Sequence, residues 1–204
     1  MDRQGYLNQI STQNRPVKKT KSGIFSSKFF WVGVGGIGAL IVIIIIGSLL
    51  SSGRTSGKDK LFSLILHINN TTALIEEYQP NVKSSSLRSH SASLYGVLTN
   101  TSKKLTDFAT EKYDFKEKDV KKDIVEEETA AKDALGTGLF EAKINGILDR
   151  IYASKMAYEI LLITNSESQT MKSMNNETLN DILDESYSSL DTLYNEFNEF
   201  SETK

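Results

Sequence analysis

The sequence contains no cysteine, and only two prolines and two histidines among its 204 residues. The missing thiols exclude a disulfide scaffold, a zinc-thiolate site, an iron–sulfur cluster and a thiol nucleophile. So few prolines argue against a sheet-rich domain with many turns. The length fits one compact domain, or one domain with a membrane anchor.

The charges are divided unevenly along the chain, although the formal net charge is only -2. Residues 1–28 carry six basic side chains and one acidic one, whereas residues 51–204 carry eighteen basic and twenty-five acidic ones. The acidic excess of the second part argues against a nucleic acid partner, because phosphates would be repelled. Residues 1–28 are polar with few apolar side chains, so we expect a disordered basic tail.

Residues 29–50 form a run of twenty-two residues without a charge, which predicts a transmembrane helix. As an α-helix the run extends roughly 33 Å, enough to cross a hydrocarbon core of about 30 Å. It is longer than the apolar core of a cleavable signal peptide, which favours an uncleaved signal-anchor. More lysines precede the run than follow it. We therefore expect a single-pass protein of the cell membrane, with a cytoplasmic N-terminus and an extracytoplasmic C-terminal domain.

Glycines within this run allow two interpretations. The letters GVGGIG match the dinucleotide-binding fingerprint, but that fingerprint requires a preceding strand and a following helix, so we reject it. Gly35 and Ala39 are four residues apart and would let two such helices approach closely, so they are candidate residues for transmembrane helix packing. An unpaired anchor is the alternative. A pilin-like surface subunit is more remote, because Lys28 stands where that family typically places a glutamate.

After a flexible Ser- and Gly-rich linker at residues 51–57, residues 58–204 have the apolar periodicity of helices. Apolar side chains recur at helical spacing through residues 61–78, which Pro80 ends, and again through residues 87–108. The clearest amphipathic stripe covers residues 179–200.

The middle of this region predicts further helices. Asp114 and Glu117 fit a capping box, so we expect a helix from near Phe115. Its apolar seam is sparse, and the glycines of residues 136–138 suggest a break or a kink. The strongest stripe follows, in which we expect a set of buried side chains: Phe140, Ile144, Ile147, Leu148, Ile151, Tyr158, Leu161 and Leu162. Ser166 and Gln169 suggest the cap of a further turn.

No stretch alternates with period two for long enough to form a strand. We therefore expect an all-α protein, in which the transmembrane helix is followed by an antiparallel four-helix-bundle-like extracytoplasmic domain. The weaker 116–135 helix would be an extra or extended element. The arrangement resembles membrane-anchored extracytoplasmic helical bundles of bacteria, including ferritin-like ones. That resemblance is one of architecture and implies no function.

Catalytic and metal-binding patterns are missing from the sequence. A di-iron bundle needs Glu-x-x-His pairs, whereas His67 and His90 have no carboxylate three or four residues away. We expect His67 to be a partly buried hydrogen-bonding residue and His90 a surface one. Residues 126–128 are three glutamates among lysines, which indicates a solvated face with i,i+4 ion pairs better than a divalent cation site. We predict no catalytic residue, no metal ligand, no cofactor and no enzyme.

These observations favour a non-enzymatic envelope protein that acts as a protein-interaction or structural module. Its expected partners are the lipid bilayer and another envelope protein, or a second copy through self-association. The alternative is an extracytoplasmic small-ligand-binding or sensory four-helix bundle that acts through a partner, similar to the periplasmic input domains of chemoreceptors. A hydrolase or metal enzyme in an unfamiliar bundle is a third hypothesis.

Overall fold

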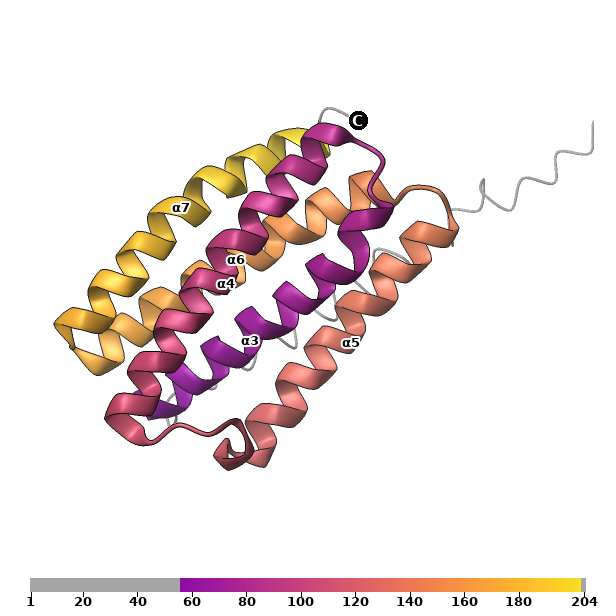
Figure 1. Ribbon diagram of the computed structural model, residues 1–204. Helices are drawn as coiled ribbons and strands as arrows, with labels where there is room; N and C mark the ends of the chain where they lie inside the picture. The colour runs from indigo at the N-terminus through magenta and orange to yellow at the C-terminus, as the bar shows by residue number, and fades with distance from the viewer. Residues whose placement is uncertain (1–55, 203–204) are drawn as a thin grey trace, which may run out of the picture. The chain divides into compact units, whose positions relative to one another are not determined.

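The computed structural model describes residues 56–202 (Figure 1). The described part is all-helical and contains no strand, which confirms the predicted class. The predicted transmembrane segment, with Gly35 and Ala39, lies outside the described residues. Between residues 56 and 202, no helix combines the length and apolarity needed to cross a membrane. The elements are α3 (Gly57–Tyr78), η3 (Gln79–Asn81), α4 (Ser85–Tyr113), η4 (Glu117–Asp119), α5 (Lys122–Ile144), α6 (Leu148–Met174) and α7 (Glu177–Glu202).

Four of these helices form a bundle, in which α3 packs on α4, α4 on α7, α7 on α6, and α6 on α3. The fifth helix, α5, lies outside this ring and packs on α3 and α6 (Figure 1). Gly57 of α3 adjoins Met174 of α6, and we call this end of the bundle the near end. The opposite end, where Tyr78 ends α3 and Leu148 begins α6, is the far end.

The first described helix begins and ends where the sequence supplies the signals. The Ser56 hydroxyl accepts a hydrogen bond from the Asp59 backbone N–H, and the Asp59 carboxylate accepts one from the Ser56 N–H, which makes a capping box. Pro80 stands in the short 3-10 turn that follows the helix. Ser84 then caps α4, because its hydroxyl accepts a hydrogen bond from the Leu87 backbone N–H.

The predicted helix start near Phe115 is wrong. Asp114 adopts the left-handed conformation at φ 51° and ends α4 as its C-cap. Glu117 belongs to a single 3-10 turn, and α5 begins only at Lys122. The intervening chain is anchored by apolar contacts, because Val120 is buried and the Phe115 ring lies 4.5 Å from the Phe62 ring, centroid to centroid.

The sequence leaves open whether the helix is continuous at residues 136–138, and the structure shows that α5 runs through them without a break. The glycine at position 136 permits a close approach of α3 instead: a Cβ atom there would lie 3.3 Å from Leu74 Cδ2. The chain breaks ten residues later. Gly146 has φ 73°, and the Ile147 N–H bonds to the Ala142 carbonyl at 3.0 Å, which is the pattern of a Schellman C-cap.

This shift of the break changes which side chains are buried. Phe140, Ile144 and Ile147 were expected in the core, yet they are 55%, 65% and 52% exposed, and Leu161 of the same predicted stripe is 39% exposed. The apolar face of α5 that does reach the core is a different one, made of Ile124, Leu135, Leu139 and Ala142. The predicted cap at Ser166 and Gln169 is wrong as well, since both lie inside α6.

Candidate functional site

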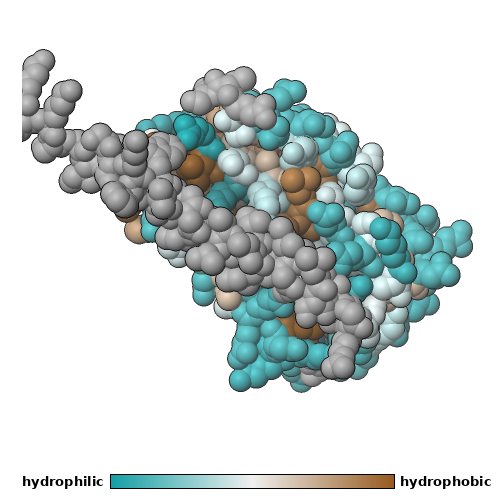
Figure 2. Space-filling view, turned by 180° about the vertical axis from the view of Figure 1, so that it is seen from behind, coloured by the Kyte–Doolittle hydropathy of each residue, from teal (hydrophilic) through white to brown (hydrophobic). Residues whose placement is uncertain are grey.

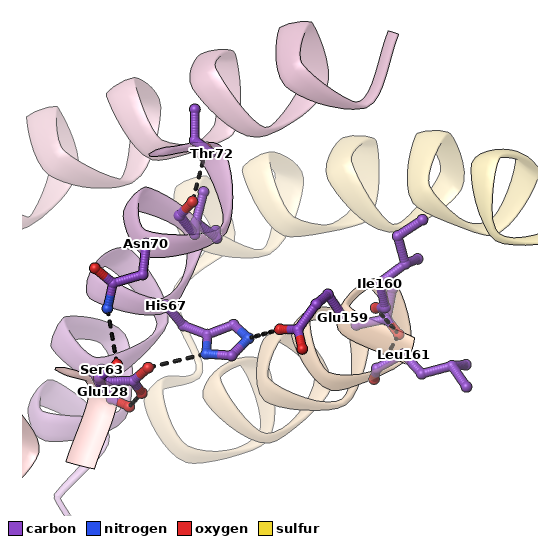
Figure 3. Close-up of polar contacts among 10 residues, drawn as sticks. Ser63, His67, Asn70, Thr72, Glu128, Glu159, Ile160 and Leu161 are labelled. Carbon is purple, nitrogen blue, oxygen red and sulfur yellow. Dashed lines mark hydrogen bonds and ion pairs between the residues drawn. The ribbon is translucent and has the colours of Figure 1, made fainter. Parts of the chain in front are cut away.

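A polar cluster surrounds His67 and lies where α3, α5 and α6 meet (Figure 3). His67 projects from α3 between a carboxylate of α5 and a carboxylate of α6. Its Nδ1 lies 2.9 Å from Glu128 Oε2, and its Nε2 lies 3.1 Å from Glu159 Oε2. The first contact is a hydrogen bond, whereas the second is an ion pair by distance without the alignment of a hydrogen bond.

Three residues of α3 bind the side chain or the backbone carbonyl of Glu128 in α5. Besides His67, the Ser63 hydroxyl donates to Glu128 Oε1 at 2.6 Å, and the Asn70 amide donates to the Glu128 carbonyl at 3.1 Å (Figure 3). Positions 63, 67 and 70 are spaced by four and three residues, so they share one face of the helix. The polar face of α3 that carries these three residues therefore binds Glu128 of α5.

The protonation state of the imidazole follows from its surroundings. Burial alone would lower the pKa of His67, since only 14% of its side chain is exposed. The hydrogen bond with Glu128, the contact with Glu159 and the negative charges of both outweigh burial and raise the pKa to about 10. At neutral pH His67 is therefore an imidazolium between the Glu128 and Glu159 carboxylates. We call these three residues the His67 clamp.

The clamp has the geometry of a structural ion cluster. Its imidazolium has no free lone pair at neutral pH, so it offers neither a general base nor a metal ligand. The two carboxylates approach opposite nitrogens of the ring and do not converge on one point. Within residues 56–202, no group of three or more His, Asp or Glu side chains is arranged to hold a metal ion.

A second buried polar group, Glu167, lies inside the four-helix bundle. Its side chain is fully buried, and neither carboxylate oxygen has a well-formed hydrogen bond. Burial raises the pKa of Glu167 to about 7, and contact with the Ser186 hydroxyl of α7 offsets part of that effect. The Ser186 hydroxyl also accepts a hydrogen bond from Thr101 of α4 at 3.1 Å. Three helices thus contribute to one polar spot in an apolar core.

A small cleft between α4 and α7 opens above this spot. Thr101 and Ser186 belong to its lining, and Lys104 and Glu185 form an ion pair of 2.7 Å beside them. The remaining lining residues are Val97, Asn100, Ile182 and Ser189. The cleft is therefore mostly polar and lies over a buried acid.

Among residues 56–202, the three most exposed large apolar side chains lie at or just after the end of α5. Phe140 and Ile144 lie one turn apart on α5, and the Schellman hydrogen bond holds Ile147 against the same last turn. We call these three residues the α5 end patch. In Figure 2 hydrophobic residues form separate patches on a surface that is mostly hydrophilic or intermediate.

The sequence located one member of the His67 clamp and missed the other two. His67 is partly buried and hydrogen-bonded, as predicted. Its carboxylate partners, Glu128 of α5 and Glu159 of α6, lie 61 and 92 residues further along the chain. Glu128 was expected on a solvated face, and only 12% of its side chain is exposed. The expected i,i+4 pairing does occur between Lys122 and Glu126 at 3.2 Å.

The second histidine is less exposed than predicted. The sequence predicts His90 at the surface, whereas only 26% of its side chain is exposed. Its Nδ1 lies 2.7 Å from Glu196 Oε2 of α7, and its ring packs near the Phe197 ring. His90 therefore links α4 to α7 near the far end of the bundle.

Comparisons with protein-family models, with curated proteins and with solved structures find no match for this chain.

Proposed function

We propose that this protein is a single-pass membrane protein of the cell envelope whose helical bundle is an extracytoplasmic, non-enzymatic module for protein interaction. The anchor is argued from the uncharged residues 29–50 and the lysines that precede them. The His67 clamp supports the non-enzymatic part of the proposal, since its charged groups are already paired with one another.

The observation that carries the interaction role is the α5 end patch. Each of its three side chains is more than half exposed, although each is of a type that usually lies inside. Grouped apolar side chains on a surface commonly mark a contact with another protein. The patch lies at the far end of α3, roughly 33 Å along that helix from Gly57. The exposed side chains of the patch are therefore open to contact with another protein.

Site-specific photocrosslinking in native membranes tests this role. A photoreactive amino acid replaces Ile144 in the full chain, and in a control variant it replaces Ser93, an exposed residue of α4. We expect an adduct with a protein at position 144 that is at least several-fold stronger than at position 93. Equal or absent adducts at the two positions would contradict the interaction role.

A ligand-binding role has one observation in its favour, the cleft between α4 and α7 with Glu167 beneath it. A small ligand carrying both an amine and an acid group would find opposite charges there, on Glu185 and Lys104. Thermal melting of the full chain with and without free amino acids tests this role. An increase in melting temperature that disappears in Thr101→Val would support it, and unchanged melting across the series would contradict it.

A further inference from the structure

We propose that the α5 end patch docks onto the same patch of a second copy of this chain, so that two anchored copies form a parallel pair. The proposal rests on the interaction role proposed above and names the partner. Three observations support it: the direction in which the patch faces, the charges on its two sides, and its small size.

The patch faces away from the bundle. At about 100° per residue, Phe140 and Ile144 lie on the side of α5 opposite to the buried Ile124, Leu135 and Ala142. Among the described helices, α3 and α6 make the main contacts with α5, and the α3 contact at Gly136 comes one turn before Phe140, which is itself 55% exposed. A partner can therefore approach the outer side of α5 without displacing any described helix.

The charges that flank the patch are self-complementary. Glu141 lies on one side of the line through Phe140 and Ile144, and Lys143 lies on the other side, by the same helical geometry. A two-fold axis parallel to α5 would bring Lys143 of one copy next to Glu141 of the partner subunit. The axis repeats each contact, so two such charge pairs would form. Two-fold interfaces use the same patch on both subunits, so a patch with opposite charges on its two sides suits such an axis.

The small size of the patch fits a pair of copies that are anchored in the same membrane. Three partly exposed side chains cover much less than the roughly 800 Å² per partner of a standard stable interface. In dilute solution such a contact would be weak. Two copies held by anchors in one bilayer have the same orientation and a high effective concentration, which strengthens a weak contact without adding area.

The absence of cysteine from the chain allows a clean test. Ile144→Cys in the full chain, in native membranes, is treated with a short bis-maleimide, and two differently tagged copies are expressed together. Val125→Cys is the matched control, because Val125 is a partly exposed apolar residue at the other end of the same helix. We expect a product of twice the chain mass that carries both tags, at least tenfold more abundant for Ile144→Cys than for Val125→Cys.

Charge variants separate specific pairing from random collision. Lys143→Glu in the Ile144→Cys background places like charges opposite each other, so crosslinking should fall several-fold. Adding Glu141→Lys restores opposite charges and should restore crosslinking. All these positions are exposed, so the variants retain the core.

The possible outcomes distinguish this inference from the proposed function. A doubly tagged product that follows the charge swap supports the pair. An adduct of a different mass, without the second tag, would overturn the pair and leave the interaction role standing. No adduct at position 144 by either bis-maleimide or photocrosslinking would overturn both.

Discussion

His67 Nε2 lies 3.1 Å from Glu159 Oε2, and this contact joins α3 to α6 at a place where both side chains are largely shielded from water. Glu128 holds the other side of the same ring and brings in α5. Because α5 buries only four apolar residues against the four-helix bundle, this ion cluster is a main determinant of where it docks. The clamp and the surrounding fold lead to four predictions.

Removing the imidazole should weaken the fold and loosen α5 first. His67→Leu leaves Glu128 and Glu159 without their cation, and breaking a buried ion pair from one side costs about 3–5 kcal/mol. Denaturant unfolding of the full chain measures the loss, and amide hydrogen exchange should show the largest gain in α5. His90→Leu is the control, since its pair with Glu196 is more exposed and should cost less. Equal losses in the two variants would contradict the clamp.

The clamp also predicts a decline in stability at alkaline pH. The pKa of His67 is about 10 in the folded protein and 6.5 when unperturbed. The folded state therefore holds a proton that the unfolded state releases between these values. The stabilisation is complete below pH 6.5 and is lost as pH rises through 10, by an amount on the order of 3 to 5 kcal/mol. The difference in unfolding free energy between wild type and His67→Gln should shrink over this range. A difference that does not change with pH would contradict the clamp.

Replacing the buried acid of the bundle should stabilise the protein at neutral and higher pH. Burial raises the pKa of Glu167 from 4.5 to about 7, so the folded state binds the proton more tightly than the unfolded state does. The resulting contribution to the free energy of unfolding is complete below pH 4.5 and is lost as pH rises through 7. Glu167→Gln keeps the shape without the charge. We expect it to gain up to about 3 kcal/mol at pH 8 and almost nothing at pH 4. A variant that is less stable at pH 8 would show that the carboxylate has a charged partner.

Two glycine variants test the helix boundaries. Gly146→Ala forces an alanine into a left-handed conformation at the junction of α5 and α6 and should cost about 1 kcal/mol. Gly96→Ala places a methyl group in open space on α4 and should gain about 0.5–1 kcal/mol from helix propensity. Thermal unfolding of both variants measures this contrast. Destabilisation by Gly96→Ala, or none by Gly146→Ala, would contradict the boundaries described here.

The sequence predicted the helices whose apolar stripes are regular and whose ends carry strong local signals. The stripes of residues 61–78, 87–108 and 179–200 are such cases. It misplaced α5, because the acidic signal at Asp114 and Glu117 serves a C-cap and a 3-10 turn instead of a helix start. α5 continues through Gly136 and Gly138 and ends next to Gly146, the one glycine of residues 56–202 with a positive φ.

The clamp could be predicted only in part, because its three members come from three helices. A polar residue every three or four positions on α3 does signal a buried polar contact, and Ser63, His67 and Asn70 give that signal. The identity of the partners depends on the parallel docking of α5 on α3, which no local pattern encodes. Glu128 looks like its neighbours Glu126 and Glu127 in the sequence and differs from them only in its position on the helix.

The central claim is that residues 29–50 anchor the bundle on the outer side of a membrane. Single-cysteine variants of the full chain test it directly, with a membrane-impermeant maleimide applied to intact cells. We predict that Ser93→Cys, on the exposed side of α4, is labelled before lysis, and that Ser11→Cys is labelled only after lysis. Labelling of Ser93→Cys only after lysis would contradict the claim.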